Sequence, residues 1–451
     1  MELSKENKMG TMPEGKLLVN MSVPIMISML VQALYNVVDS WFVSMVSTDA
    51  FAAVTLAFPI QLLMISVSVG TGVGINSLIS RRLGEERFKQ ADAAAENGIF
   101  LCILSSIVFA IFGLFFSEIF IGSFTTNPDV LKMGTDYLRI CTIFSFGVFV
   151  QVAMERIMQA TGNSFYNMIV QGTGAIINIV LDPIFIFGLF GMPKLGAMGA
   201  AIATVIGQIV AMAFGLYVNI KKNDKININM FKFRPSLKIT KEIYAVGIPS
   251  MVMQSITSVL TIGLNKVLMT FSQSAVSVYG AYFKLQSFIF MPVFGLTNGM
   301  IPIIGYNYGA KNKKRILKTI KLGLIVSVLI MLVGMISFQI VPDRLLLIFN
   351  ADAEMIEIGI PALRIISTSF VFAGISIVYS CVFQAVGKAG YSLIISIIRQ
   401  LLVILPVAYI MAKILGLSFV WTAFPIAEFI ALIMSIIMYL RLYRKYIKTI
   451  D

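Results

Sequence analysis

The sequence predicts an all-α polytopic membrane protein with about twelve transmembrane helices, in two six-helix bundles related by a parallel pseudo-twofold repeat. Three observations lead to this fold class. Hydrophobic residues make up 58% of the chain, charged residues only 13%, and the mean hydropathy is +0.89, whereas soluble domains carry roughly 25% charged residues. Apolar stretches of helical length follow one another along the chain, and the two halves share a sequence repeat.

Each expected span is an apolar stretch of roughly 20 residues or more, which is enough to cross a bilayer as a helix. The spans lie near residues 17–45, 51–80, 92–117, 133–160, 164–190, 197–220, 242–271, 276–307, 316–340, 355–386, 390–412 and 417–440. One long polar linker, residues 221–241, separates the sixth span from the seventh. It divides the chain into an N-lobe (1–220), a cytoplasmic linker (221–241) and a C-lobe (242–451).

A constant offset of 225 residues aligns the two lobes. The aligned pairs include Pro24 with Pro249, Gln61 with Gln286, Gly70 with Gly295, Gly74 with Gly299, and QATG at 159–162 with QAVG at 384–387. Because each lobe has an even number of spans, both lobes enter the membrane from the same side, and the repeats are parallel. Secondary transporters use such repeats to build two bundles around a central cavity.

The basic residues are sorted by side. Most of the 35 Lys and Arg residues lie before the first span, after the even-numbered spans, or in the central linker. The opposite loops carry only Lys132, Lys194, Arg344 and Lys413. The positive-inside rule therefore predicts that both termini lie in the cytoplasm. We expect a multi-pass protein of the plasma membrane. Because the net charge of +13 follows from this topology, we expect no nucleic-acid partner.

Two of the predicted spans contain the carboxylates that are the strongest candidates for a site. Asp39 is the only group charged at neutral pH in the apolar stretch 23–43, and a mid-membrane carboxylate costs at least ~2.5 kcal/mol. Asn178 and Asp182 are four residues apart, so they share one helix face, and Pro183 disfavours helical geometry at Asp182. Carboxylates beside a broken helix indicate a cation site. The alternatives are a structural hydrogen bond at Asp39 and a helix cap at Asp182.

The other charges within spans are weaker signals. Glu155 and Arg156 lie near the cytoplasmic end of the fourth span, where they could pair with each other or with a loop. Arg399 and Glu428 could form one intramembrane pair. A structural role is favoured for all four residues. The glycine-rich stretch GTGVG at 70–74 lies inside an apolar span, which indicates close helix packing rather than a nucleotide loop.

Several classes of chemistry have no sequence support. The motifs GxxxxGK[ST], HExxH and GxSxG are absent, so neither an ATP-driven pump nor an enzyme is indicated. The chain has no histidine, so proton chemistry would depend on carboxylates or tyrosines. Cys102, Cys141 and Cys381 lie in apolar runs without metal-type spacing, which is typical of reduced, packed thiols. We expect no cofactor.

A set of motifs, taken in order, resembles the multidrug and toxic compound extrusion (MATE) family in its bacterial DinF-like branch. The resemblance covers essentially the whole chain. The motifs are QxxYNxVD at 32–39, DYLRI at 136–140, QATGN at 159–163, NxxxDPIFIFG at 178–188 and GAAIAT at 199–204. Each motif is weak alone, whereas their order and spacing form a specific signature.

The resemblance implies outward antiport of cationic or amphiphilic drugs against inward Na⁺ or H⁺. It assigns the N-lobe cation site, which would ligate Na⁺ if Na⁺ is the coupling ion, to Asp39, Asn178, Asp182 and Thr204. It also places Tyr137 beside this site, Gln32 and Tyr35 at the drug cavity, and the bend of the first span at Pro24.

One residue departs from the family pattern. Glu155 occupies a position near the substrate cavity where a neutral polar residue is expected. In the C-lobe, Leu264, Val403 and Val407 are apolar, which favours a cation site in the N-lobe.

Two other functions remain open from the sequence. A flippase or exporter of lipid-linked oligosaccharides from the same superfamily would tend to carry a cationic cavity, whereas the candidates here are carboxylates. A non-transporting membrane sensor or assembly factor gives no reason to place Asp39 and Asp182 in separate spans. The expected partners are small cationic or amphiphilic molecules and the bilayer, with the protein acting as a monomer. The sequence leaves the drug spectrum and the choice between Na⁺ and H⁺ open.

Overall fold

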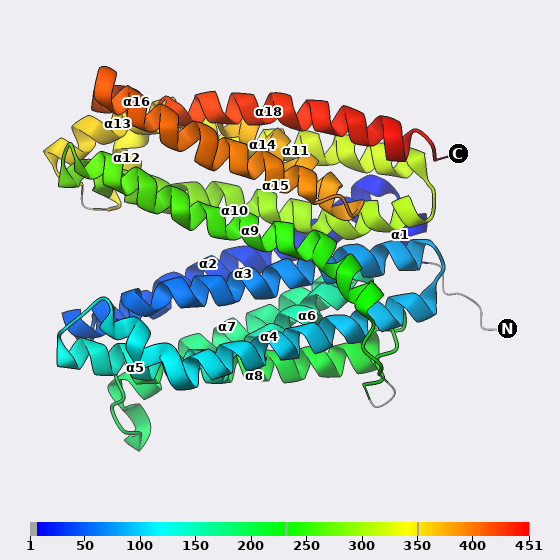
Figure 1. Ribbon diagram of the computed structural model, residues 1–451, viewed down its shortest axis with the longest axis horizontal. Helices are drawn as coiled ribbons and strands as arrows, with labels where there is room; N and C mark the ends of the chain where they lie inside the picture. Colours follow the sequence, from blue (N-terminus) through cyan, green and yellow to red (C-terminus); the bar gives the residue numbers. More distant parts are fainter. Residues whose placement is uncertain (1–6, 231–232, 350, 451) are drawn as a thin grey trace. The chain divides into compact units, whose positions relative to one another are not determined.

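Helices form almost the whole of the computed structural model (Figure 1), which describes residues 7–230, 233–349 and 351–450. Residues 231–232 of the expected linker lie outside this description. Ten helices in the described parts are long and apolar enough to cross a membrane, or twelve when each of two bent helix pairs counts as one span. No strand occurs among the described residues. The expected all-α membrane fold is therefore confirmed.

The helices of the first half are α1 (Lys8–Thr11), α2 (Glu14–Ser44), α3 (Thr48–Gly84), α4 (Phe88–Gly122), α5 (Pro128–Ile143), α6 (Phe146–Ala160), α7 (Ser164–Phe187), the 3₁₀ turn η1 (Leu189–Gly191) and α8 (Ala197–Lys222). Those of the second half are α9 (Leu237–Met269), α10 (Gln273–Gly309), α11 (Lys313–Ile340), α12 (Pro342–Leu347), α13 (Ala353–Ser367), α14 (Phe370–Ala385), α15 (Gly390–Ile397), the π-helical η2 (Ile398–Ile404), α16 (Leu405–Ile414), α17 (Leu417–Val420), α18 (Ala423–Leu442) and the π-helical η3 (Tyr443–Ile447).

The helix boundaries follow the 225-residue repeat. Both ends of α3 fall on both ends of α10 at this offset. The N-cap serines correspond as well, because Ser47 accepts a hydrogen bond from the Ala50 amide and Ser272 accepts one from the Ala275 amide. Since a side-chain oxygen at the N-cap satisfies an otherwise unpaired amide, the same local signal starts both helices. The internal repeat is thus present in the structure as well as in the sequence.

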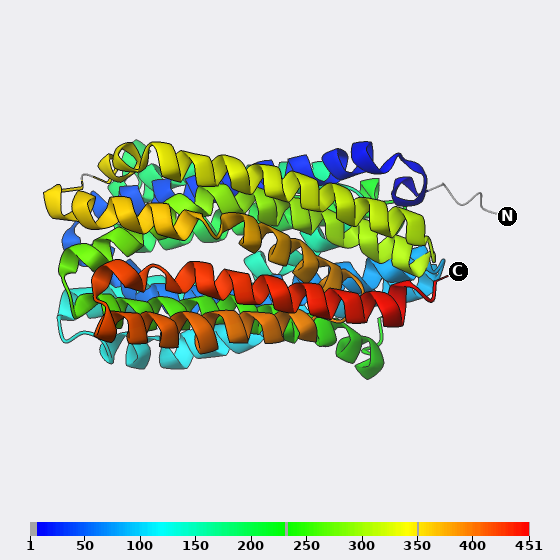
Figure 2. The ribbon, with the colours of Figure 1, turned by 90° about the horizontal axis from the view of Figure 1, so that it is seen from above.

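Two of the expected spans are bent. The helices α5 and α6 meet at 43°, and α13 and α14 meet at 47°; Figure 2 shows the change of direction in the yellow-to-gold ribbon of the second pair. The residues between the helices, 144–145 and 368–369, are neither proline nor glycine. Because no helix breaker marks these positions, the sequence predicted single continuous spans there.

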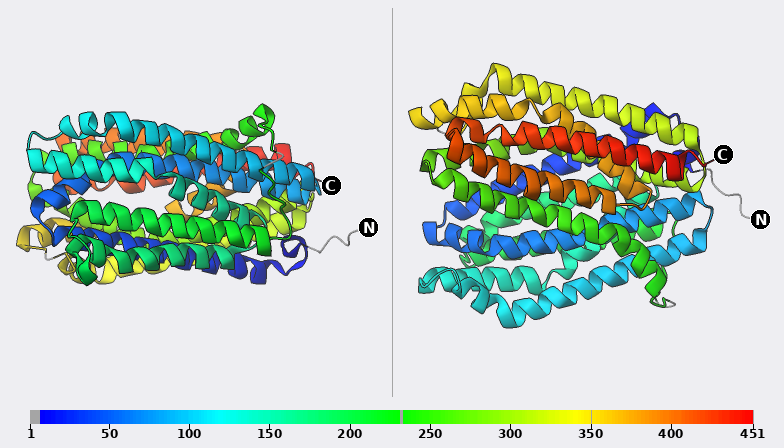
Figure 3. Two further views of the ribbon diagram at one scale, coloured as in Figure 1. Left: turned by 90° about the horizontal axis from the view of Figure 1, so that it is seen from below. Right: turned by 45° about the horizontal axis from the view of Figure 1, so that its top comes forward.

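Two compact units divide the chain: residues Ile27–Met251, called the N-unit, and Met1–Met26 with Val252–Asp451, called the C-unit. The long helices of each unit run beside one another (Figure 3). The boundaries cross α2 and α9 and do not follow the linker at 221–241. The first part of α2 therefore belongs to the C-unit, and the first part of α9 belongs to the N-unit.

Small residues allow these exchanged helix segments to pack closely. In the N-unit, a Cβ added at Gly74 would lie 2.2 Å from the carbonyl oxygen of Ile243 on α9. In the C-unit, a Cβ at Gly299 would lie 2.9 Å from the Cα of Ser22 on α2. Since only glycine permits backbones to approach so closely, the expected packing role of GTGVG is confirmed.

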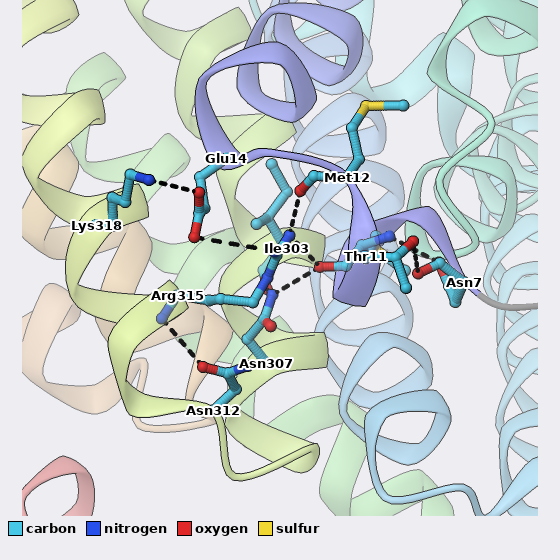
Figure 4. Close-up of polar contacts among 10 residues, drawn as sticks. Asn7, Thr11, Met12, Glu14, Ile303, Asn307, Asn312, Arg315 and Lys318 are labelled. Carbon is cyan, nitrogen blue, oxygen red and sulfur yellow. Dashed lines mark hydrogen bonds and ion pairs between the residues drawn. The ribbon is translucent and has the colours of Figure 1, made fainter.

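The N-terminal segment is fixed to the C-unit through backbone carbonyls (Figure 4). Arg315 Nη2 donates hydrogen bonds to the carbonyl oxygens of Met12 at 2.6 Å and Met9 at 3.1 Å, and Asn307 Nδ2 donates to that of Met9 at 3.0 Å. Glu14 forms an ion pair with Lys318 at 2.8 Å. These contacts hold the start of α2 against α10 and α11.

The C-terminal segment reaches the same part of the C-unit. Lys313, the first residue of α11, donates a hydrogen bond from Nζ to the carbonyl oxygen of Lys448 at 3.1 Å. Because the N-terminal segment also contacts the start of α11 through Arg315, the first and last described segments of the chain lie at one end of this unit (Figure 1). This agrees with an even number of spans.

Candidate cation site

The four residues assigned to the cation site come from three helices of the N-unit: Asp39 from α2, Asn178 and Asp182 from α7, and Thr204 from α8. Asp182 is fully buried, while Asn178 and Thr204 are 3% and 8% exposed. The close approach of α7 and α8 depends on Gly207, where a Cβ would lie 2.7 Å from the Gly174 carbonyl oxygen. This glycine contact brings Thr204 within reach of Asn178.

Asn178 connects the two helices by hydrogen bonds. With its amide oriented to satisfy both neighbours, Nδ2 donates to Asp182 Oδ2 at 3.2 Å. Its oxygen then accepts from the hydroxyl and the backbone amide of Thr204, at 3.1 and 3.2 Å. Because Asn and Asp four residues apart share a helix face, the spacing read from the sequence produces this contact directly.

The carboxyl groups of Asp39 and Asp182 lie in hydrogen-bonding contact with each other. Two carboxylates at this separation repel strongly in a low-dielectric interior, so both cannot stay ionised unless a cation lies between them. Asp39 Oδ1 is buried and has no hydrogen-bond partner. The geometry therefore requires either a shared proton or a bound cation, and it leaves one oxygen available as a ligand.

Two tyrosines lie beside this pair. Tyr35 is close enough to both carboxyl groups to interact with them electrostatically, and Tyr137 is close enough to Asp39. Tyr137 is 2% exposed, and its hydroxyl accepts a hydrogen bond from Gln61 Nε2 at 3.1 Å. The family resemblance places Tyr137 beside the cation site, and in the structure Tyr137 lies near Asp39; its role there stays a prediction. The sequence singles out Gln61 only through its recurrence as Gln286 in the repeat, and this recurrence does not indicate a contact with Tyr137.

Gln32 and Gln171 link α2 to α7 on the approach to the site, with Gln171 Nε2 donating to Gln32 Oε1 at 3.0 Å.

The expectation that Pro183 breaks the helix at Asp182 is wrong. The helix α7 runs without interruption to Phe187 and ends at Gly188, which has a φ of 74°. A proline inside a helix still removes one backbone donor, so its effect is limited to a single lost hydrogen bond one turn earlier.

Glu155 belongs to a second polar cluster, on α6. It is 7% exposed and accepts a hydrogen bond from Gln151 Nε2 at 2.9 Å. The neighbouring Arg156 donates from Nη1 to Gln159 Oε1 at 2.9 Å, and Asn76 on α3 reaches the same oxygen at 3.4 Å. The assignment of Glu155 to the substrate cavity stays a prediction.

The donor set of the site consists of oxygen atoms. Carboxylate, amide and hydroxyl oxygens suit hard cations, whereas sulfur and imidazole ligands suit transition metals. Among the described residues, no three His, Cys, Asp or Glu side chains come together as metal ligands. Two facing carboxyl groups with an adjacent amide and hydroxyl therefore fit a proton or one small hard cation.

Comparison with known proteins gives the family. The MatE family model matches residues 24–184 and 249–410, so it covers both halves of the repeat. Similar relatives include the multidrug export protein MepA of Staphylococcus haemolyticus strain JCSC1435, with 28% identity over 92% of this chain and 90% of the relative. MepA of Staphylococcus aureus strain MSSA476 is 27% identical over 95% and 94% of the two chains.

The fold agrees with a solved structure described as the outward-facing conformation of a multidrug resistance MATE family transporter of the MOP superfamily. The TM-score is 0.93 with 27% identity, and the match covers 100% of each chain. Since the family model also matches more than half of this sequence, the chain belongs to the MatE family.

Proposed function

We propose that this chain is a secondary active multidrug exporter of the plasma membrane, which moves cationic or amphiphilic compounds outward in exchange for Na⁺ or H⁺. The similar relatives are named multidrug export proteins. The observation that carries the proposal is the contact between Asp39 and Asp182, two carboxyl groups that need a proton or cation between them. A group that binds and releases a cation is what an antiporter requires.

The proposed cycle alternates two occupants of the pair. When a proton or Na⁺ binds between Asp39 and Asp182, their charge is neutralised and the site loses its attraction for a cationic drug. When the ion leaves, the charged carboxylates attract the drug or repel each other apart. Asn178 on α7 holds Asp182 in place and is itself bonded to Thr204 on α8, so Asp39 on α2 is the partner that moves.

Ion entry supplies enough energy for this exchange. A membrane potential contributes ~2.3 kcal/mol per elementary charge per 100 mV. One entering cation exchanged for an uncharged compound, or two exchanged for a monovalent cationic drug, move one net charge inward and can therefore concentrate the drug outside by roughly fifty-fold per 100 mV. A one-for-one exchange against a monovalent cationic drug is electroneutral and is driven by the concentration gradient of the ion alone. The orientation with both termini in the cytoplasm, which the basic loops predict, makes the first half of α2 the cytoplasmic half.

The proposal is tested by efflux of a fluorescent cationic dye from cells that express the protein. We expect efflux to stop when ionophores collapse the ion gradients while ATP is held high by a fermentable carbon source. Cells with the empty vector provide the baseline. Efflux that continues without any gradient but requires ATP contradicts the antiport mechanism. An absence of dye efflux under all conditions favours the flippase or the sensor.

A further inference from the structure

The C-unit contains an ion pair within its spans, which the proposed cation exchange does not use. Arg399 lies in the π-helical stretch η2 and Glu428 in α18, two elements that run side by side (Figures 1 and 2). Arg399 Nη1 lies 3.1 and 3.4 Å from the two carboxylate oxygens of Glu428, and the side chains are 22% and 12% exposed. The pairing expected from the sequence is therefore confirmed.

The sequence repeat relates this pair to the cation site. At the 225-residue offset, Val403 corresponds to Asn178 and Phe429 to Thr204. Arg399 lies one helical turn before Val403, and Glu428 directly precedes Phe429. The ion pair thus occupies the C-unit's counterpart of the region beside the N-unit's cation site, where the N-unit has only Gly174 and Ala203.

Arg399 makes fewer hydrogen bonds than expected of an arginine whose ion pair has a purely structural role. A guanidinium offers five N–H donors, and paired forks that use two parallel hydrogen bonds are the strong arrangement. Here a single nitrogen, Nη1, reaches the carboxylate, while Arg399 Nε is buried without a partner. The oxygen Oε1 of the adjacent Gln400 is also buried without a partner. A π-helical turn, a feature often found at functional sites, presents both residues.

Aromatic side chains complete the surroundings of the carboxylate. Tyr282 on α10 lies close enough to interact electrostatically with both Glu428 and Arg399. The rings of Tyr282 and Phe424 have centroids 5.7 Å apart, and Tyr279 lies 6.3 Å from Phe424. A carboxylate next to aromatic rings is an arrangement that recognises organic cations. In this chain a cation belonging to the protein fills it.

We propose that Arg399 is a tethered cation, which permanently fills a guanidinium-type cation site at Glu428 and so prevents the C-unit from taking a cation from solution. Coupling is thereby confined to Asp39 and Asp182. The statement about coupling rests on the proposed function, because it concerns ion entry that drives export. The cation site at Glu428, by contrast, can be tested by binding alone. Its ligand class is a small monovalent organic cation that resembles the arginine head group.

The binding experiment uses the full chain in nanodiscs with methylguanidinium as the probe. In an Asp39→Asn, Asp182→Asn background, adding Arg399→Ala should create a saturable site, measured by calorimetry, that is about ten-fold tighter than any binding to the background. Adding Glu428→Gln should abolish it, and Arg399→Lys should not create it. A folded Arg399→Ala variant that binds no more methylguanidinium than its background overturns the inference.

The same set of variants also controls for a loss of folding. If Arg399→Ala is unstable, methylguanidinium should raise its melting temperature while leaving the wild type and Arg399→Ala, Glu428→Gln unchanged. Failure of this rescue, with the double variant folded, also overturns the inference.

Transport distinguishes a tethered cation from a structural pair. With Asp39 and Asp182 intact, Arg399→Ala should make dye efflux depend more steeply on coupling-ion concentration, while Arg399→Lys keeps the wild-type dependence. Unchanged steepness contradicts the inference. Robust export by Asp39→Asn, Asp182→Asn would instead refute the proposed function, whatever the methylguanidinium result.

Discussion

Asp39 and Asp182 have apolar counterparts in the second half of the chain. At the 225-residue offset they correspond to Leu264 and Val407, and Leu264 is fully buried. The second half therefore folds into equivalent helices without these carboxylates. A purely structural role for Asp39 and Asp182 is hard to reconcile with this, because a buried carboxylate costs free energy that an apolar residue does not.

At the residue scale, we predict that Asp39→Asn and Asp182→Asn each abolish energised dye efflux. Both variants should fold, with a melting temperature equal to or above that of the wild type, because removing a buried charge is neutral or stabilising by up to a few (~1–4) kcal/mol. Val407→Ala and Leu264→Met serve as matched controls and should keep most of the efflux. Robust export by the Asp39→Asn, Asp182→Asn variant would contradict the assignment and make Glu155 and Glu428 the next candidates for the coupling carboxylate.

The site could be predicted from the sequence only where local spacing determines the contact. The i, i+4 relation of Asn178 and Asp182 follows from helix geometry, and a lone charge in an apolar span marks Asp39. Thr204 came only from the family resemblance, because no spacing rule relates it to α7. Gln61 reaches Tyr137 through the packing of α3 against α5, which a single sequence does not specify.

At the element scale, the lengths of the apolar stretches predicted the helix boundaries to within several residues: the spans expected at 51–80 and 276–307 are the helices α3 (Thr48–Gly84) and α10 (Gln273–Gly309). The Ser47 and Ser272 caps were found only in the structure. The bends at 144–145 and 368–369 and the π-helical stretch η2 were not predictable. The residues at the two bends are neither proline nor glycine. The stretch η2 is followed by Pro406, which removes the hydrogen bond to the carbonyl of residue 402, but a proline alone does not specify a π-helical turn. Pro183, by contrast, suggested a break where α7 is continuous, while the bend expected at Pro24 stays a prediction.

Gly74 tests the close packing of α3 on α9. We predict that Gly74→Ala lowers the free energy of unfolding by about 1–3 kcal/mol, because its Cβ would meet the backbone of Ile243 and force one helix away. Thermal unfolding in detergent measures this. Gly172→Ala is the matched control, since a Cβ there meets nothing within 4 Å, and it should leave stability unchanged or raise it by up to ~1 kcal/mol. Equal melting temperatures for the two variants would show that α3 and α9 do not depend on this contact.

Pro24 lies two residues before the point where α2 passes from the C-unit into the N-unit. Proline cannot donate a helical hydrogen bond, so this position bends at low cost. We predict that Pro24→Ala slows dye efflux several-fold while expression and melting temperature stay equal or rise. Pro249→Ala, its counterpart in α9, should have the smaller effect because α9 carries Leu264 where α2 carries Asp39. Unchanged efflux in Pro24→Ala would leave this proline without a role in transport.

At the scale of the whole molecule, each unit combines one half of the repeat with the first helical segment of the other half. The N-terminal segment is held by Arg315 and Asn307 of the C-unit, and the start of α9 is held in the N-unit by an ion pair between Arg82 and Glu242 at 2.6 Å. Both α2 and α9 therefore have anchored first parts. Sequence periodicity could not reveal this exchange, because a division at the polar linker is equally compatible with the spans.

A flux measurement on the purified protein in liposomes without ATP tests directly whether cation entry through the Asp39–Asp182 pair drives drug export. An imposed Na⁺ or pH gradient should drive a cationic dye against its own gradient, while the dye in turn moves the coupling ion the opposite way. The Asp39→Asn, Asp182→Asn protein should do neither. Gradient-driven dye transport at the wild-type rate by that variant, or dye movement that no ion gradient influences, would contradict antiport through the Asp39–Asp182 pair.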